Sequence, residues 1–152
     1  MSALKQKHRE DLHSRWRKSW STLKRYSHIS RIDSSTLSKK FIKATGFLPK
    51  SRSGVLFQLR SGHITLNKYL HRINHSDTPN CLQCDQEAPE TVHHFLFNCP
   101  CYERERHILR SRIGRAASST ADLLGSDEAV METLKYMRET GRFNTKQGEV
   151  QM

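Results

Sequence analysis

A chain of 152 residues with 35% hydrophobic residues and a mean hydropathy of −0.75 is long enough for one domain with a modest core. No apolar run approaches the roughly 18 residues that a membrane-spanning helix needs. The N-terminus, MSALKQKHRE, is charged where a signal peptide has its apolar stretch. We therefore expect an intracellular protein, of the cytoplasm or the nucleus, that has no contact with a membrane.

The net charge of +11 is unevenly distributed along the chain. Residues 1–80 contain 17 Lys and Arg against 4 Asp and Glu, a net charge of +13. Residues 81–152 contain 9 against 11, a net charge of −2. A basic half of this kind is typical of proteins that contact a polyanion, but a solvated basic surface would have the same composition.

Residues 3–27 are predicted to form a basic helix. Leu12, Trp16, Trp20 and Leu23 recur at helical spacing, and Lys and Arg fill most of the positions between them. We expect the two tryptophans to pack against the rest of the protein, and base stacking on their rings is the alternative.

Three further helices are predicted before the first cysteine. Asp33 or Ser34 can cap the first of them, which closes at Gly46. The second covers about residues 51–61, and Thr65 can cap the third. The inward-facing residues of these helices would be Leu37, Phe41, Ile42, Val55, Leu56, Leu59, Leu66, Tyr69, Leu70 and Ile73.

The pattern stays helical beyond the cysteines. Residues 102–113 form a basic helix that Gly114 ends, and residues 121–124 and 127–140 form the last helical turns. Their apolar stripes would be Ile108, Leu109, Ile113, Val130, Leu134 and Met137. Residues 141–152 are expected to be a frayed tail. Because no strand pair, internal repeat or low-complexity segment is evident, the predicted fold is a mainly α, small helical domain.

Residues 81–99, CLQCDQEAPETVHHFLFNC, hold the strongest chemical pattern. In a reducing compartment a C-x2-C pair indicates metal or redox chemistry rather than a disulfide. The helix that follows Pro89 should end near Cys99, because Pro100 pushes the residue before it out of the α region. The chain can then turn Cys99 back towards a histidine, although residues five apart on a continuous helix point about 140° away from each other.

The predicted metal ligands are Cys81, Cys84, His94 and Cys99, in a C-x2-C-x9-H-x4-C arrangement. Three thiolates with one imidazole form a closed, tetrahedral structural zinc site. The alternative is that these are buried cysteines and a satisfied histidine without a metal. His93 is the competing ligand, and the apolar face of the helix favours His94 because that residue points away from it.

Two neighbours of this cluster are assigned other roles. Cys101 is a spare thiol that packs or stays free. Glu90 is the nearest candidate base for a catalytic zinc, but a position at a helix start explains this carboxylate more simply. A catalytic site would also need an open coordination position.

An ordered series of motifs resembles the zinc-binding region of the reverse transcriptases of non-LTR, LINE-type retrotransposons, most closely the fungal ones. The series is QLRSGHITLNKYLHRI (58–73), C-x2-C, ETVHHFLFNCP (90–100) and YERER (102–106), and the resemblance extends from about Trp16 to Phe143. It implies the same four zinc ligands, a place C-terminal to polymerase and RNase H domains, and a role in holding RNA or DNA.

The resemblance covers no catalytic domain. No Asp-Asp pair of the kind that binds the polymerase metals occurs in the chain, so we expect no enzyme activity and no small-molecule substrate. We expect a basic helix over residues 1–30, a helical zinc-binding domain over 31–143 and a flexible tail over 144–152. The alternatives are a protein-interaction module, with a partner such as a reverse transcriptase, or a decayed element fragment without activity.

The nucleic-acid contacts expected from the basic half and the helix after the cysteines carry affinity rather than sequence specificity. Arg60 and His63 have an equally plausible structural role, in which they bond helix ends around Gly62. The candidate contact residues are Lys39, Lys40, Lys43, Lys50, Arg52, Arg60, His63, Lys68, Arg72, Arg104 and Arg106.

Overall fold

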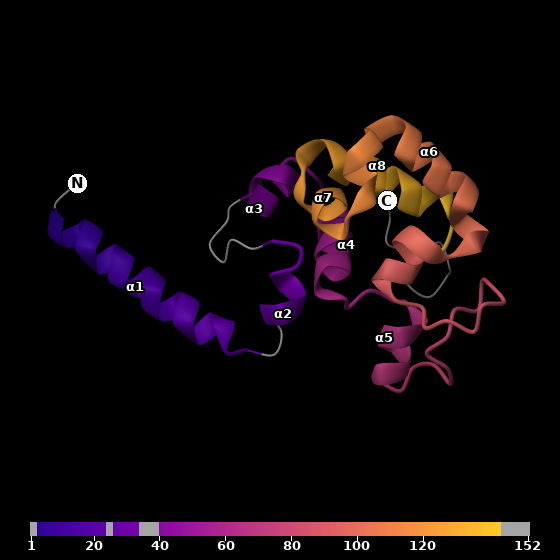
Figure 1. The fold of residues 1–152 in the computed structure, drawn as a ribbon, viewed down its shortest axis with the longest axis horizontal. Coiled ribbons are helices and arrows are strands. Elements are labelled where there is room, and N and C mark those ends of the chain that lie inside the picture. Colours follow the sequence, from indigo (N-terminus) through magenta and orange to yellow (C-terminus); the bar gives the residue numbers. More distant parts are fainter. Residues whose placement is uncertain (1–2, 24–25, 34–39, 144–152) are drawn as a thin grey trace. The chain divides into compact units, whose positions relative to one another are not determined.

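A computed structural model describes residues 3–23, 26–33 and 40–143 (Figure 1). The chain forms two compact units, Met1–Ser38 and Lys39–Met152, here named the N-terminal and the C-terminal unit. The division falls after residue 38, whereas the sequence placed a boundary after residue 30. The predicted flexible tail, residues 144–152, lies outside the described residues.

The N-terminal unit contains the long helix α1 (Ala3–Ser21) and the short helix α2 (Tyr26–Ile29). No residue of α1 is buried. Trp16 and Trp20 stand one turn apart and stack on each other, with ring centroids 5.5 Å apart and planes 5° apart. Packing of this face against another part of the protein stays a prediction.

The C-terminal unit is helical, and no β-strand occurs in the part of it that the structure describes. This confirms the predicted mainly α class.

Among the described helices, none is both long and apolar enough to cross a membrane. The elements are α3 (Lys40–Thr45), α4 (Lys50–Ser61), α5 (Asn67–Arg72), the π-helix η1 (His94–Asn98), the 3₁₀ segment η2 (Pro100–Tyr102), α6 (Glu103–Ile113), the 3₁₀ segment η3 (Gly114–Ser118), α7 (Thr120–Gly125) and α8 (Asp127–Glu139).

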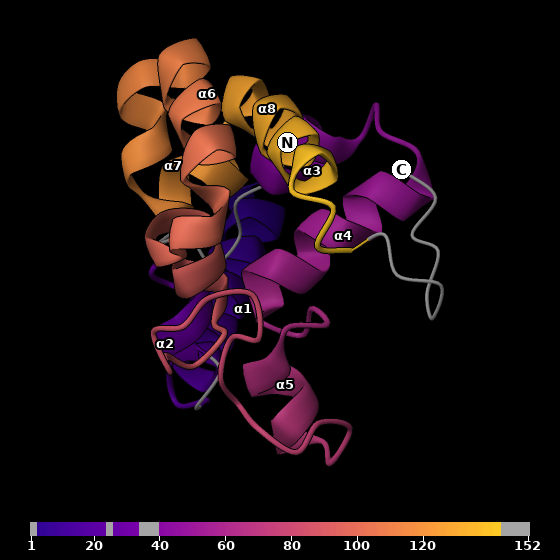
Figure 2. The same cartoon turned by 90° about the vertical axis from the view of Figure 1, so that its right-hand side faces the viewer.

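Helix α8 lies at the centre of this unit and packs against α3, α4, α6 and α7 (Figures 1 and 2). Its predicted apolar stripe is buried, at Val130, Leu134 and Met137. Burial of each such side chain stabilises the fold by roughly 1.5–3 kcal/mol relative to exposure. The apolar stripe of α8, which its periodicity predicted, therefore forms part of the core of this unit.

Glycine and serine residues set the helix ends. Gly62 ends α4 in the left-handed conformation, with φ 70°, and its backbone amide donates to the α4 carbonyl of Leu59. Ser119 and Ser126 cap α7 and α8, where each hydroxyl accepts a backbone amide of the first turn. Gly114, with φ 54°, ends α6 as predicted.

Two predicted core residues are wrong. Ile42 in α3 and Ile73, which follows α5, were expected to face inward, but both side chains are exposed. Phe41 lies instead beneath the guanidinium of Arg60, 4.3 Å from its ring centroid. Of the two proposed caps of α3, Asp33 is the last residue of the described segment 26–33, and Ser34 belongs to residues 34–39, which are outside the described part.

Candidate metal centre

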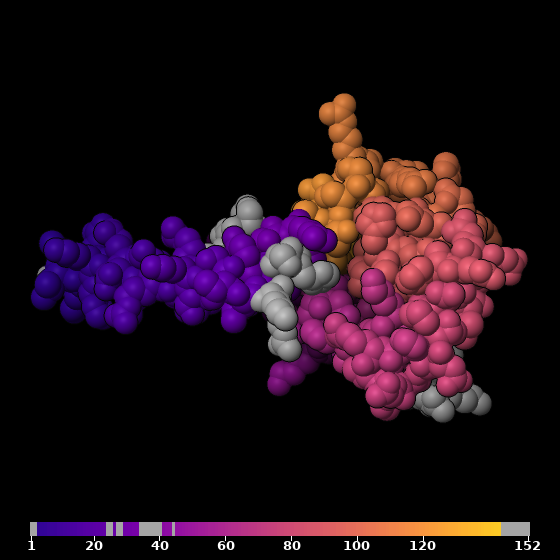
Figure 3. Space-filling view, turned by 60° about the horizontal axis from the view of Figure 1, so that its bottom comes forward, coloured from indigo at the N-terminus to yellow at the C-terminus, as the bar shows by residue number. Residues whose placement is uncertain are grey.

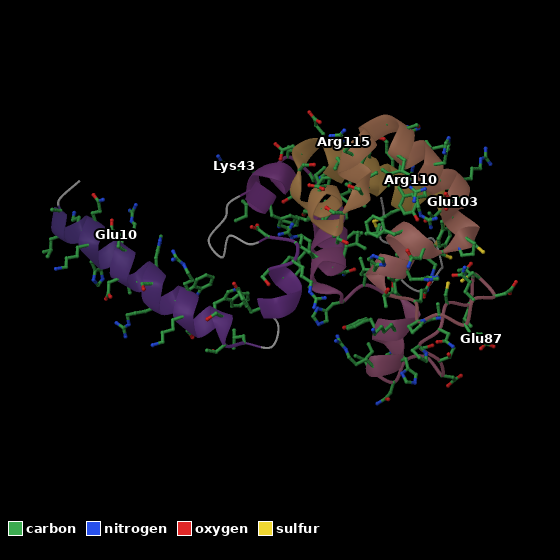
Figure 4. All side chains as sticks on the ribbon, in the orientation of Figure 1. Glu10, Lys43, Glu87, Glu103, Arg110 and Arg115 are labelled. Carbon is green, nitrogen blue, oxygen red and sulfur yellow. The ribbon has the colours of Figure 1, made fainter. Side chains whose placement is uncertain are left out.

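Cys81 and Cys84 lie in a closed loop at one end of the C-terminal unit. Asn80 and Pro89 form an isolated antiparallel bridge at the base of this loop, and the Cys81 amide donates to the Ala88 carbonyl at 2.9 Å. The loop projects beside α5 in Figure 1, with Glu87 on its exposed part in Figure 4. This short closed turn holds the two thiols of the C-x2-C pair on one side.

The other two candidate ligands are brought together by a π turn. The Cys99 amide donates to the carbonyl of His94, five residues earlier, at 2.8 Å. A π turn widens the helix by one residue, so that positions five apart come to lie on the same side. Cys99 itself is extended, with φ −62° and ψ 118°, as its position before Pro100 predicts. The sequence indicated the helix end but not the π turn.

The four candidate ligand atoms lie close enough together to bind a single metal ion. All lie within 4.8 Å of one another, and all four side chains are buried. The Cys81 and Cys99 Sγ atoms are 3.9 Å apart, and Cys84 Sγ is 3.4 Å from His94 Nε2. Metal–sulfur bonds of about 2.3 Å and metal–nitrogen bonds of about 2.0–2.1 Å in a tetrahedron give edges of about 3.8 and 3.5 Å. The cluster could therefore hold a metal ion.

His93 and Cys101 lie outside this cluster. The His93 ring is exposed and packs against Phe97, with centroids 5.0 Å apart. Cys101 is also exposed, and its thiol contacts the carbonyl of Gln83. The structure thus brings together the four residues selected by their spacing and leaves their two neighbours out.

Burial sets the protonation of the ligands before any metal binds. Desolvation lowers the pKa of His94, which keeps the imidazole neutral and its ring nitrogen able to bind a metal. Desolvation raises the pKa of Cys81, and it raises that of Cys99 to about 12. A raised pKa favours the neutral thiol, so a metal ion that bound here would displace protons from the cysteines.

Glu90 joins the cysteine loop to two distant parts of the chain. Its side chain is 1% exposed and lies with Oε1 4.0 Å from Cys81 Sγ. Its Oε2 accepts the backbone amide of Asn67, the first residue of α5, at 2.7 Å. Arg142 donates to both carboxylate oxygens at 2.6 Å. Glu90 is therefore not an exposed base, and it does not lie at a helix start. It also takes the place of Thr65, the residue predicted to cap α5.

Arg106 supports the fourth ligand from α6. Its side chain is buried, and its Nε and Nη2 donate to the carbonyls of Leu96 at 3.1 Å and Cys99 at 2.5 Å. It also pairs with Glu103 on the same helix. The expectation that Arg106 contacts nucleic acid is corrected, because its guanidinium is enclosed by protein groups.

Arg60 is a second buried arginine for which the structural role holds. Its Nη1 donates to the carbonyl of Leu124 near the end of α7, at 2.6 Å, while its guanidinium lies over Phe41. Hydrogen bonding to a helix end was the predicted structural alternative, although the helix is α7 and not one beside Gly62. Its assignment to a phosphate-binding surface is therefore also corrected.

The remaining candidate contacts differ in exposure. Lys43 extends outward from α3 in Figure 4. His63 is half-buried, with its ring edge-on to Tyr69. Lys39 and the side chain of Lys40 lie outside the described residues. The other exposed or half-exposed members are Lys50, Arg52, Lys68, Arg72 and Arg104.

The contacts of Arg142 and Phe143 were not predicted, because residues 141–152 were expected to be a frayed tail. Both are described and packed: Phe143 is buried edge-on against Phe95, with centroids 5.2 Å apart. The signal was an apolar residue just after a glycine that follows a helix, since such residues often pack back on the helix end. Gly141 has a positive φ, 63°, as is common for a glycine that follows a helix.

The chain matches no protein-family model, no curated protein and no solved structure.

Proposed function

We propose that the chain is a zinc-stabilised module that binds RNA or DNA and has no catalytic activity of its own. The observation that carries the zinc part is the buried set of Cys81, Cys84, His94 and Cys99. Three thiolates and one imidazole select zinc over the hard cations, which prefer oxygen ligands. When bound, zinc would supply folding energy by cross-linking the cysteine loop to the π turn.

A structural role for the zinc follows from the closed ligand set. A catalytic zinc keeps one position for water or substrate, whereas four protein ligands fill the tetrahedron. The nearest carboxylate, Glu90, is held by Arg142 and the amide of Asn67, so it has no free oxygen for proton transfer. These contacts favour a structural ion.

Nucleic-acid binding is supported by the charge distribution and by the resemblance to the retrotransposon region. The net charge of +13 over residues 1–80 is a feature of phosphate-binding proteins. Exposed cationic side chains lie on α3, α4, α5 and α6, at Lys43, Lys50, Lys68, Arg72 and Arg104. Contacts of this type give affinity with little sequence preference, so we expect RNA and DNA to bind comparably.

A protein-interaction module is the second candidate, and one observation favours it. Phe47 and Phe57 are 62% and 63% exposed, although large apolar side chains of this size are usually buried. A partner such as a reverse transcriptase could cover them. This function predicts partner binding that depends on the two phenylalanines and is insensitive to salt.

The test is elemental analysis of the purified chain, followed by binding to generic RNA and DNA at several salt concentrations. We expect one zinc per chain and binding that weakens steeply with salt, because each neutralised phosphate releases counterions. A stably folded, metal-free chain would overturn the zinc proposal. Zinc-loaded protein that binds neither nucleic acid at low salt would overturn the second part.

A further inference from the structure

A short segment after α8 closes on the metal centre, although it lies more than forty residues beyond the last ligand. Residues 141–143, here named the strap, begin at Gly141 after the end of α8. Arg142 makes a bidentate ion pair with Glu90, and Phe143 packs on Phe95, the residue next to His94. The strap therefore contacts the neighbours of two ligands without contributing a ligand.

We propose that Arg142 is a positioning residue of the metal centre, whose pairing with Glu90 permits zinc to stay bound beside a buried carboxylate. The inference rests on the proposed zinc site. It goes further because it assigns control of metal retention to a segment outside the ligand-bearing residues 81–99.

The negative charges of the thiolates and of Glu90 favour a cationic side chain next to Glu90. Three thiolates around Zn²⁺ give a net charge of −1, and the Glu90 carboxylate lies 4.0 Å from the Sγ of one ligand, Cys81. Two negative groups at this separation repel strongly in a buried environment. Arg142 donates to both Glu90 oxygens, and the side chains of this pair are only 14% and 1% exposed. Its guanidinium thus offsets the repulsion directly.

Glu90 also has a structural role. Its charge is therefore neutralised by Arg142, and an uncharged residue does not take its place. Its Oε2 also accepts the first amide of α5, from Asn67, and the Asn67 side chain donates to the Asn80 carbonyl at 2.8 Å. Glu90, at one end of the cysteine loop, is therefore linked through Asn67 to Asn80 at the other end. Without Arg142, Glu90 would still be held beside Cys81, but as an unpaired buried charge.

Phe143 gives the strap its packing contact. Phe95 is fully buried and touches three aromatic rings, those of Phe143, Tyr102 and Tyr136. The Tyr136 hydroxyl also donates to the Phe95 carbonyl at 2.6 Å. Docking of Phe143 on this cluster keeps Arg142 within reach of Glu90, so that the ion pair and the packing support each other.

The experiment measures the rate at which zinc passes from the loaded chain to a chromophoric chelator. The variants are Arg142→Gln, Arg142→Lys and the double change Glu90→Gln with Arg142→Gln. We expect Arg142→Gln to speed release by about 10- to 100-fold, the range by which changes in the groups around the ligands usually weaken metal binding. Arg142→Lys, which keeps the charge, should recover part of the loss.

The double variant separates a charge effect from a packing effect. Gln at position 90 can still accept the Asn67 amide, but it carries no charge, so release should return most of the way to the rate of the unmodified chain. Release as fast as in Arg142→Gln, or faster, would overturn the proposal. Cobalt-loaded samples of each variant should keep the thiolate-to-cobalt absorption, which shows that three sulfur ligands still bind.

Two controls complete the design. Arg138→Gln removes an equal, exposed charge from α8 and should leave the release rate unchanged. Ending the chain after Gly141 should act like Arg142→Gln, whereas ending it after Phe143 should not. Equal release from both shortened chains would also overturn the proposal. A chain that holds no zinc under any condition would instead refute the proposed function.

Discussion

His94 and His93 are neighbours in the sequence, yet only one of them faces the cysteines. His94 is buried with Nε2 3.4 Å from Cys84 Sγ, whereas His93 is exposed against Phe97. We predict that His94→Ala weakens zinc binding by at least about 100-fold, beyond the range for groups outside the ligand set. His93→Ala should change it by less than about threefold. Competition with a chelator measures both, and equal losses would contradict the assignment.

Arg106 and Arg104 provide a second comparison at the scale of single residues. Arg106 is 2% exposed and donates to the carbonyls of Leu96 and Cys99, whereas Arg104 is exposed. Arg106→Leu removes both hydrogen bonds, leaves the Cys99 carbonyl with only the Tyr102 amide, and should lower the free energy of unfolding by about 2–4 kcal/mol. Arg104→Leu should change it by no more than about 0.5 kcal/mol. Urea unfolding measures both, and similar stabilities would show that the Arg106 contacts contribute little.

Among the elements, α4 and α5 carry exposed cations that no carboxylate neutralises in the described part of the chain. We predict that Lys50→Gln, Lys68→Gln and Arg72→Gln together flatten the salt dependence of nucleic-acid binding. The slope of log affinity against log salt should fall by up to about three, near one for each lost phosphate contact. Titration at four or more salt concentrations gives the slope.

A matched control for this prediction removes the same charge from ion-paired positions. Arg110 pairs with Glu103, which lies beside it on α6 in Figure 4, and Arg112 and Lys135 both pair with Glu132. Changing these three cations to Gln should alter the slope by less than one. If the control set has the larger effect, the contact surface is not on α4 and α5.

The helices that could be predicted are those whose signals are local. Helices α4, α6 and α8 each pair a periodic apolar pattern with a glycine or serine at an end, and the structure places them within a residue or two of the predicted bounds. The start of α5 could not be predicted, because its cap is Glu90, 23 residues away. The π turn at His94 was not predicted, because Pro100 indicates only where the helix ends.

At the scale of the whole molecule, metal removal should unfold the region that the four ligands connect. We predict that chelation, or Cys84→Ser, lowers the melting temperature and exposes the cysteine loop to proteases. Structural zinc in small domains contributes about 10–16 kcal/mol of apparent binding energy, which is largely folding energy. Added zinc should restore the chelated chain but not the variant.

The control for this prediction is the exposed fourth cysteine. Cys101→Ser leaves the cluster intact and should melt at the temperature of the unmodified chain. Circular dichroism melts with and without chelator measure the difference. A chelated chain with an unchanged melting curve would show that the cluster is stable as buried thiols.

The ligands of the candidate site could be predicted because they lie within residues 81–99, where spacing limits the possible chelates. The residues around them could not be predicted for a different reason. Arg60, Arg106 and Arg142 come from three separate segments, and in a chain of net charge +11 an arginine looks like a surface cation. Only the packed structure shows that these three are enclosed.

The distance along the chain between the ligands and Arg142 has a consequence during synthesis. Roughly 40 residues separate Cys99 from Arg142, and at about 5–20 residues per second they take roughly 2–9 s to translate. All four ligands are therefore synthesised before Arg142, while Glu90 still lacks its partner. With zinc bound as proposed, a nascent chain would meet the ion before Arg142 is in place, and it would retain the ion firmly only after the segment beyond its last helix has been made.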